Sequence, residues 1–271
     1  MKHVVVIEDF EGWNEWFKDG KVKIESLNIK EELHPNQGIV LKGAGAKEHG
    51  TVKGEYVVKV RQHFPCGIHP KNTEQTLALS LLSDPDISLT ILSGVAGSGK
   101  TLLACAHALH RLNSKDKISR IVIAKSMTPV GREIGFLKGD MEDKVMPWLG
   151  PFYDNFINCG YDSFMIEKMI ERGQVEITPI TFIQGRSISN AVIIIDEVQN
   201  LDINIIKQIV TRAAAGTQII LLGDQTQTFE RVQSRSMDIL LDRSKSSSLV
   251  GSIHLQKTLR SPISDWAVRN L

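Results

Sequence analysis

The sequence has few cysteines, no long apolar run and almost no net charge. Its 271 residues include only Cys66, Cys105 and Cys159, which are widely spaced and form no C-x-x-C pair. An odd number of scattered cysteines suits a reducing compartment and excludes a small disulfide-stapled secreted domain. Cys66 and His69 invite a metal interpretation, but two ligands fall short of the four in a structural zinc site, so we favour ordinary residues.

No apolar run approaches the length of a membrane span, and Glu8 and Asp9 interrupt the N-terminus too early for a signal peptide. We therefore expect a soluble, cytoplasmic protein with no membrane partner. The formal net charge is +1, so the surface lacks a global basic field. Any contact with nucleic acid must then be a local groove or loop, with an affinity that depends steeply on salt.

Residues 94–101 read Gly-Val-Ala-Gly-Ser-Gly-Lys-Thr, which fits the phosphate-binding pattern G-x-x-x-x-G-K-[ST]. The apolar run 87–92 predicts a buried strand before this loop, and residues 101–112 carry apolar side chains at helical spacing after it. Such a strand, loop and helix direct backbone N–H groups at a bound polyanion. Lys100 would bind the β- and γ-phosphates, and Thr101 would bind Mg²⁺. The expected nucleotide-binding residues here are Gly94, Val95, Ala96, Gly97, Ser98, Gly99, Lys100, Thr101 and Leu102. A chance glycine turn is the weaker alternative.

Two acidic residues, Asp196 and Glu197, follow the all-apolar run 191–195. A strand buried on both faces that ends in paired carboxylates is suited to phosphoryl transfer. Asp196 would hold Mg²⁺, and Glu197 would act as the base that polarises the attacking water. The alternative is that both residues cap the helix expected to begin near Asp202. The complete phosphate loop upstream favours the catalytic interpretation.

Gln75 has two interpretations. The segment 72–82 predicts an amphipathic helix with Asn72 as its N-cap, and Gln75 then occupies the capping-box position. A glutamine can also form a bidentate pair with the N6 and N7 edge of adenine. Spacing alone does not decide between them.

Further candidates lie after the predicted strand 217–222. Gln227 could reach the γ-phosphate or the attacking water, with Asp224 as a supporting hydrogen-bond acceptor, although Gly-Asp also favours a simple turn. Arginine can neutralise charge that develops on a transferred phosphate. Arg235 and Arg260 are candidates because the rest of the predicted site has no arginine.

The pattern predicts an α/β domain over residues 63–271, with a mainly parallel sheet and helices on both faces. The remaining expected strands are 120–124, 175–178 and 252–255. Residues 139–158 and 162–172 predict two helices, interrupted by Pro147 and Pro151, that form an insertion over about 139–173.

Residues 1–62 predict a separate, β-rich N-terminal domain, followed by a linker over 63–71. Its closely spaced strand-like runs favour a small antiparallel barrel or meander: 4–7, 22–27, 39–42 and 56–60. Trp13, Trp16 and Phe17 could stack nucleic-acid bases, or they could form the core of this small domain. We favour the core interpretation because large aromatic side chains dominate core energetics.

Six motifs, taken together and in order, resemble the PhoH family of P-loop ATPases. They are residues 70–75, 94–101, 131–140, 184–187, 196–200 and 223–227. The likeness extends over residues 70–271. The segments 234–236 and 259–261 look most like the helicase half of the PIN-PhoH fusion proteins, and the N-terminal piece looks like the segment that joins their two halves.

The resemblance implies a single RecA-like core, ATP hydrolysis with Mg²⁺, RNA or another single-stranded nucleic acid as partner, and a homo-oligomeric, hexameric ring. Family roles carry over to matched positions: Lys100, Thr101, Asp196, Glu197 and Gln227, with Gln75 as the adenine reader. Gln225 departs from the smaller or apolar residue that is usual there. The nuclease domain of the fusions has no counterpart, which implies that this chain does not cut RNA.

One RecA-like core needs an arginine from a neighbouring subunit, so we expect Arg260 or Arg235 to act in trans. The leading hypothesis is an ATP-driven RNA helicase or translocase. The alternative is an ATP-driven conformational switch or nucleic-acid-binding regulatory module without unwinding activity. A small-molecule kinase is disfavoured because Glu197 beside Asp196 suits the activation of water.

Overall fold

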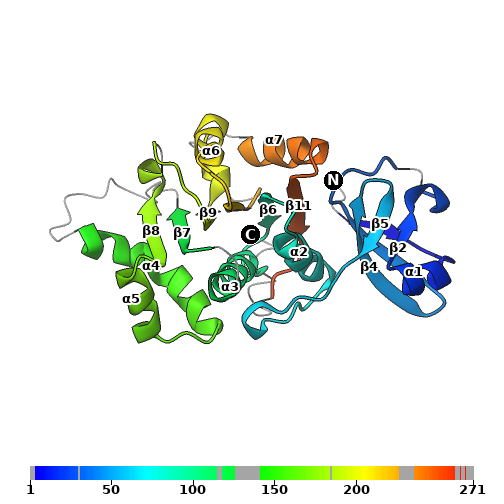
Figure 1. Ribbon diagram of the computed structural model, residues 1–271, viewed down its shortest axis with the longest axis horizontal. Coiled ribbons are helices and arrows are strands. Elements are labelled where there is room, and N and C mark those ends of the chain that lie inside the picture. Colours follow the sequence, from blue (N-terminus) through cyan, green and yellow to red (C-terminus); the bar gives the residue numbers. More distant parts are fainter. Residues whose placement is uncertain are drawn as a thin grey trace.

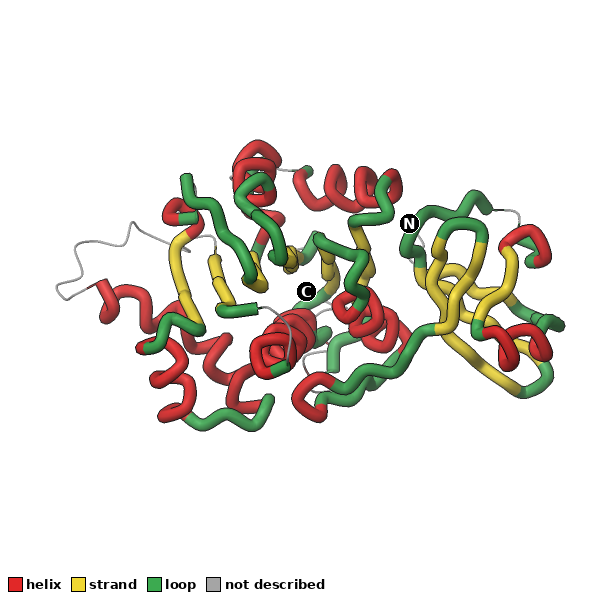
Figure 2. Tube along the Cα trace, viewed as in Figure 1, coloured by secondary structure: helices red, strands yellow, loops and turns green. Residues whose placement is uncertain are grey.

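The computed structural model describes residues 4–29, 31–114, 118–125, 141–183, 185–225 and 235–259, with Ile263 and Trp266; for 141–149 it describes the backbone only. Two sheets organise this part of the chain (Figures 1 and 2). A five-stranded sheet forms an N-terminal β region, which we define as residues 4–60. A six-stranded sheet with helices on both faces forms the rest.

The described residues of the N-terminal β region form one α-helix and five strands. They are β1 (Val4–Ile7), α1 (Trp13–Asp19), β2 (Lys21–Lys23), β3 (Gly38–Gly43), β4 (Ala46–Lys53) and β5 (Tyr56–Lys59). The strand order is β1-β3-β4-β5-β2, with β1 parallel to β3 and the other pairs antiparallel. The expectation of a purely antiparallel meander is therefore wrong for β1. The expected strand 22–27 is also too long, because a 3₁₀ turn over Ile24–Ser26 follows β2.

The aromatic residues of α1 divide between core and surface. Trp16 is fully buried in the cluster that also contains Phe10 and Leu41, which confirms the core interpretation for this residue. Phe17 is 59% exposed. Its ring stacks on that of Trp13, with centroids 5.6 Å apart. The Phe17 ring is thus exposed at the surface, and the Trp13 ring stacks on it.

The larger sheet is parallel throughout, which confirms the predicted α/β class. Its strands are β6 (Leu89–Gly94), β7 (Arg120–Lys125), β8 (Val175–Pro179), β9 (Ala191–Asp196), β10 (Gln218–Gly223) and β11 (Val250–Leu255). Their order is β11-β6-β10-β9-β7-β8. Because all strands run in one direction, their carboxyl ends meet at a single edge, where ligands bind in such sheets.

Two apolar layers cover this sheet (Figure 1). One contains α2 (Thr73–Ser83), α3 (Lys100–Asn113), α4 (Met141–Asn158) and α5 (Ser163–Glu171); the other contains α6 (Ile203–Val210) and α7 (Ser236–Arg243). Successive strand residues point to opposite faces. Ile194 of β9 accordingly joins the first core, while Ile193 and Ile195 join the second.

Helix α4 corrects one sequence expectation. It continues through Pro147 and Pro151 rather than being interrupted there. Each proline removes one N–H from the helical hydrogen-bond pattern and crowds the carbonyl four residues before it, at a cost of about 3 kcal/mol. Phe152 and Phe156, one turn apart, are both buried in the core shared with α3, and that apolar burial stabilises the uninterrupted helix.

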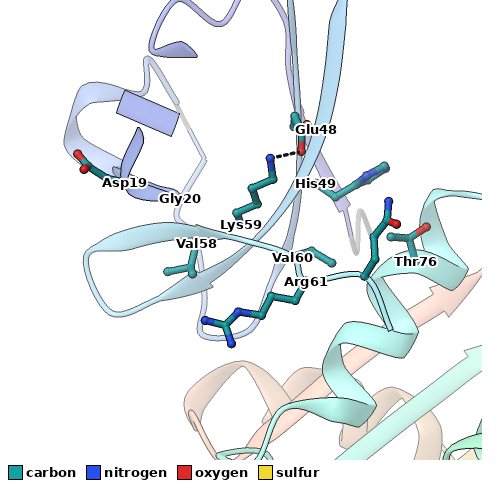
Figure 3. A pocket seen from close by; sticks show the side chains of 10 residues that line it. Asp19, Gly20, Glu48, His49, Val58, Lys59, Val60, Arg61 and Thr76 are labelled. Carbon is teal, nitrogen blue, oxygen red and sulfur yellow. Dashed lines mark ion pairs between the residues drawn. The ribbon is translucent and has the colours of Figure 1, made fainter. Parts of the chain in front are cut away.

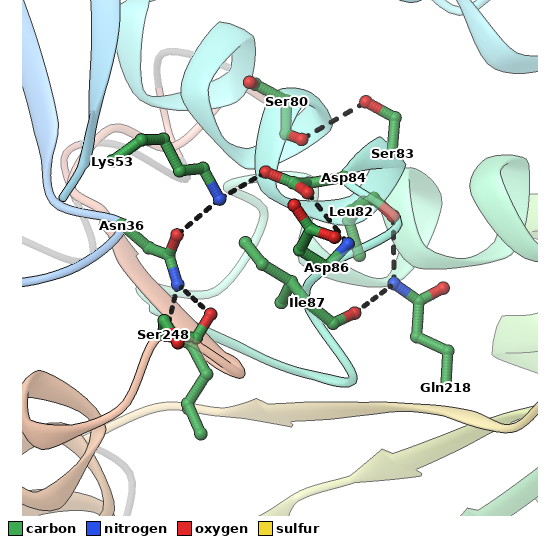
Figure 4. A network of polar contacts seen from close by, with 11 residues as sticks. Asn36, Lys53, Ser80, Leu82, Ser83, Asp84, Asp86, Ile87, Gln218 and Ser248 are labelled. Atoms are coloured by element: carbon green, nitrogen blue, oxygen red, sulfur yellow. Dashed lines mark hydrogen bonds and ion pairs between the residues drawn. The ribbon is translucent and has the colours of Figure 1, made fainter. Parts of the chain in front are cut away.

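Helix α2 lies between the N-terminal β region and the parallel sheet (Figure 4). Asn36 Nδ2 donates to the carbonyl oxygens of Ser248 (2.8 Å) and Val250 (3.0 Å). Lys53 donates to Asn36 Oδ1 (2.7 Å) and forms an ion pair with Asp84 just after α2 (2.5 Å). These bonds join β4, α2 and β11 into one polar network.

Apolar packing supports the same arrangement. A Cβ at Gly38 would lie 2.7 Å from Leu77 Cδ1, so β3 approaches α2 too closely for any side chain. Leu77 is fully buried. The N-terminal β region is therefore packed tightly against α2.

His107 makes folding stability depend on pH. It is buried in α3, and its Nε2 lies 2.8 Å from Gln218 Oε1 of β10. Burial lowers the pKa of His107, the hydrogen bond with Gln218 acts against this fall, and the Arg111 charge adds to it, so that the pKa is about 3. The unfolded state then binds the proton more strongly between about pH 6.5 and pH 3. We expect this residue to reduce the free energy of unfolding by up to about 1.4 kcal/mol per pH unit as the pH falls through that range.

Urea unfolding at several pH values measures this slope. The His107→Gln variant cannot titrate and should flatten the acid limb, whereas His110→Gln should leave it close to wild type. An equally steep acid limb in His107→Gln would assign the slope to other groups.

Candidate nucleotide-binding site

The phosphate loop joins the end of β6 to the start of α3. Its backbone depends on glycines: φ is +148° at Gly94, +75° at Gly97 and +94° at Gly99. A Cβ at Gly94 would collide with the carbonyl oxygen of Leu255, and one at Gly99 would lie 2.7 Å from Gln75 Nε2. Positive φ and close approach both require glycine. The pattern 94–101 therefore sets the loop's shape as well as its polarity.

Lys100 is folded back over this loop. Its Nζ donates to the carbonyl oxygens of Gly94 (2.5 Å) and Val95 (3.0 Å). The ammonium group thus lies against the phosphate loop, just before the N-terminus of α3. Loops of this kind before a helix N-terminus bind phosphate. Leu259 N–H also donates to Gly97 O (2.9 Å), so the segment after β11 lies against the loop.

Asp196 and Glu197 end the strand β9. Asp196 is 8% exposed, and its Oδ1 accepts the Glu197 backbone N–H at 3.0 Å. Burial, followed by the Glu197 charge, raises the pKa of Asp196 to about 6, while the charges of Lys125 and Lys100 act against this rise. The influence of Lys100 places the phosphate-loop cation in the same electrostatic environment as this carboxylate.

Glu197 has a left-handed backbone, with φ +58° and ψ 39°. This conformation is uncommon for a residue other than glycine, and residues that adopt it are enriched at functional sites. Glu197 Oε2 accepts a hydrogen bond from Gln199 Nε2 at 2.6 Å. The turn thus fixes the direction of the second carboxylate.

Gln199 lies in the candidate site, and the sequence patterns predicted no role for it. It is 1% exposed and bonds to both neighbouring strand ends: Nε2 to Glu197, and Oε1 to the backbone N–H of Asp224 at 3.1 Å. Gly223 leaves room for it, since a Cβ there would lie 3.0 Å from Gln199 Oε1. Gln199 therefore positions Glu197 relative to the end of β10.

A polar cluster lies behind the phosphate loop. His254 Nδ1 of β11 is 2.9 Å from Ser93 Oγ of β6. Burial lowers the pKa of His254; the charge of Asp224 raises it, and that of Lys100 lowers it. The charges of Asp224 and Lys100 thus both act on the His254 imidazole. The sequence patterns predicted no role for this histidine.

Gln75 supports the phosphate loop directly. Its backbone N–H is capped by Asn72 Oδ1 (2.9 Å), which confirms Asn72 as the N-cap of α2. The buried side chain donates from Nε2 to Ser98 O (3.0 Å) and accepts the Lys71 N–H at Oε1 (2.8 Å). The amide thus contacts the loop whether or not it also reads adenine.

We expect Gln75→Ala to lower the free energy of unfolding by about 1–3 kcal/mol, because the Ser98 carbonyl and the Lys71 N–H both lose a partner. Chemical denaturation without nucleotide measures this loss. Thr76→Ala, one residue along α2, is the matched control and should cost less. If Gln75→Ala is as stable as Thr76→Ala, the amide does not support the loop. A lower preference for ATP over GTP in the same variant would add the adenine role.

The structure describes most of the predicted site residues and places them at the same sheet edge. Arg235 precedes α7 and is exposed. Its neighbour Ser236 donates from Oγ to Val198 O (3.3 Å), directly after the acidic pair. Gln227 and Arg260 lie outside the described residues, as do the motif positions 131–140. Within the described ranges no cluster of three His, Cys, Asp or Glu side chains could hold a metal ion. No described helix is long and apolar enough to span a bilayer.

The parallel sheet, the glycine loop at the end of β6 and the carboxylates at the end of β9 define a P-loop NTPase fold. The PhoH-like protein family matches residues 67–271 of this sequence. The chain belongs to this family.

Several relatives extend the match toward the N-terminus. Protein PhoH2 of Bacillus subtilis (strain 168) is 34% identical over 262 residues, covering 92% of this chain and 59% of that protein. Protein PhoH2 of Mycolicibacterium smegmatis is 28% identical over 254 residues, covering 91% and 57%. The chain thus spans less than two thirds of the length of these relatives.

Similar solved structures include the large terminase from a thermophilic bacteriophage, with a TM-score of 0.45, 12% identity, and coverage of 74% of this chain and 50% of the terminase. The Pif1 helicase from Bacteroides gives a TM-score of 0.34 and 16% identity, with coverage of 72% and 44%. The strand order and the phosphate loop of this chain define its P-loop NTPase fold.

Proposed function

We propose that this chain hydrolyses ATP with the help of Mg²⁺. The single observation that carries the proposal is that the loop before Lys100 and the Asp196–Glu197 pair lie at the carboxyl ends of β6 and β9, two strands of one parallel sheet with only β10 between them. The glycine loop and the helix N-terminus fit a triphosphate, and the two carboxylates fit the end at which it is cleaved.

Each residue has a distinct role in this proposal. Lys100 would exchange the Gly94 and Val95 carbonyls for phosphate oxygens, so its charge moves from the loop to the ligand. The Thr101 hydroxyl and Asp196 would hold Mg²⁺, which neutralises charge on the phosphate oxygens when bound. Glu197, aimed by Gln199, would take the proton from the attacking water. Gln227 would orient that water.

We further propose that hydrolysis is coupled to RNA and takes place in a ring of six subunits. The six ordered motifs support this coupling through their resemblance to the PhoH family, and the segments 234–236 and 259–261 support it through their resemblance to the helicase half of the fusion proteins. ATP turnover, measured with and without single-stranded RNA on a preparation whose mass is known from light scattering, tests it. Turnover that rises with RNA, together with unwinding of a tailed duplex, is expected. Turnover that RNA leaves unchanged would instead favour an ATP-driven switch.

Mixing variants tests the arginine proposed to act in trans. If Arg260 completes a neighbour's site, Arg260→Ala and Lys100→Ala should each be inactive alone, and a mixture should regain part of the activity. The same pairing with Arg235→Ala tests the second candidate. Full ATPase activity from a strictly monomeric preparation would contradict both assignments.

A further inference from the structure

A groove of about 600 Å³ lies between the N-terminal β region and α2 (Figure 3). This volume is within the usual range for ligand sites, which often lie at the junction of two structural units. A smaller pocket of about 90 Å³ shares four of its lining residues and extends it toward the linker: His49, Arg61, Gln62 and Thr76. The groove is separate from the phosphate loop, because Gln75 and Thr76 are on different sides of α2.

The groove contains one guanidinium group that no acidic side chain neutralises in the part of the chain that the structure describes. Arg61 is exposed and is joined there to no carboxylate by an ion pair (Figure 3). Lys59 beside it is already paired with Glu48 at 3.2 Å. A free guanidinium offers planar donors that match a phosphate group. Gln62 and Thr76, farther along the wall, provide amide and hydroxyl groups for polar edges.

An exposed aromatic ring borders the same groove. Lys59 Nζ lies 5.1 Å from the ring centroid of Phe17, and Asp19, two residues farther along the chain, is part of the lining. Phe17 is 59% exposed, with Trp13 stacked on its ring and the Lys59 ammonium over it, so a base that stacks there would displace Lys59. Aromatic rings of this kind stack on unpaired bases of any sequence.

We propose that this groove binds a single-stranded nucleic acid, with a phosphate at Arg61 and a base against Phe17. An arginine that forms no ion pair among the described residues, a stacking ring and polar side chains fit alternating phosphates and bases better than a peptide, since aliphatic side chains are few in the described lining: Val58 and Val60 in the groove and Leu79 in its extension. The proposal rests on the proposed function for its biological role, and it adds a location for the bound nucleic acid. Helix α2 would connect the two sites, because Thr76 lines the groove while Gln75 bonds to Ser98 of the phosphate loop.

Fluorescence anisotropy with a labelled single-stranded oligouridylate, without nucleotide, tests this site. Phe17→Ala is expected to weaken binding about five- to 150-fold, because it removes the ring on which one base stacks. Arg61→Ala is expected to weaken binding about tenfold or more, because it removes charge-assisted hydrogen bonds to a phosphate. Arg61→Ala should also reduce the slope of log affinity against log salt by about 0.7, the value for one phosphate contact on a single strand.

Helix α5 supplies matched controls. Phe164 is 67% exposed with Lys168 Nζ 5.6 Å from its ring centroid, which reproduces the Phe17–Lys59 pair away from the groove. Phe164→Ala and Arg172→Ala should leave the affinity within about twofold of wild type, the scale on which surface changes act. Equal losses in these controls, or no loss in Arg61→Ala and Phe17→Ala, would overturn the proposal. Competition by hepta-glutamate as strong as by unlabelled oligouridylate would also overturn it.

Crosslinking the wild-type chain to an oligonucleotide that contains 4-thiouridine gives a result independent of variant folding. Crosslinked peptides should map to residues 13–20 and 56–62, and crosslinks confined to other segments would overturn the site. The two proposals can fail separately. Binding that requires Arg61 without any ATP turnover would remove the proposed function and leave the groove site. ATP turnover together with RNA binding that Arg61→Ala does not weaken would support the proposed function and overturn the groove site.

Discussion

ATP turnover by the Glu197→Gln variant is expected to be about 10²–10⁴-fold slower than that of wild type, the usual contribution of a general base. Glutamine has the shape of glutamate but cannot take a proton from water. Its side-chain oxygen can still accept the Gln199 hydrogen bond, and the backbone N–H can still donate to Asp196. The variant should therefore fold and bind ATP normally. Phosphate release and titration with a fluorescent ATP analogue measure the two effects.

Glu171→Gln is the control for this change. Glu171 is an exposed glutamate of α5 that pairs with Lys168 at 2.6 Å, so the same chemical substitution is made away from the site. Turnover in Glu171→Gln should equal that of wild type. If Glu197→Gln retains more than about a tenth of wild-type turnover, the base assignment is wrong.

Lys100→Ala is expected to weaken ATP binding about a hundredfold or more. The ammonium group would make charge-assisted hydrogen bonds to phosphate, each worth about 1.5–3 kcal/mol, and alanine makes none. Isothermal titration with ATP and Mg²⁺ measures the loss. Without nucleotide the variant also leaves the Gly94 and Val95 carbonyls without this donor, so its unfolding should be measured alongside.

Lys168→Ala removes a lysine of the same charge from the exposed face of α5 and should bind ATP as wild type does. ATP binding to Lys100→Ala within threefold of wild type would show that the phosphate loop does not hold the triphosphate. Together with Glu197→Gln, this variant separates nucleotide binding from the chemical step.

The phosphate loop was the most predictable part of the structure. Residues 94–101 require glycine for positive φ and for close approach to Leu255 and Gln75, so the sequence pattern and the backbone geometry have the same cause. The acidic pair was also found, because an apolar strand ends in it. The bridging role of Gln199 was not predictable, since it depends on the distance between the ends of β9 and β10, which no local pattern specifies.

The N-terminal β region was harder to predict. Strand β4 was missed because Lys47, Glu48 and Gly50 interrupt any apolar alternation within it. Gly50 nevertheless lies inside the sheet, paired with Ile39, and glycine is needed there because a Cβ would be 2.5 Å from Val57 Cγ1 and 3.0 Å from Trp16. Trp16 was predicted to lie in the core, but no local pattern indicated that it packs over Gly50 of β4. Tertiary packing thus outweighed local sequence preference.

The position of α2 between two sheets sets a limit on how this chain can be divided. The family match begins at residue 67, but a fragment cut there would uncover Leu77 and leave the carbonyls of Ser248 and Val250 without the Asn36 amide. Exposed apolar surface of this kind promotes aggregation. The boundary of the family match is thus not a boundary of cooperative folding, and we expect the N-terminal β region and the parallel-sheet domain to melt in a single transition.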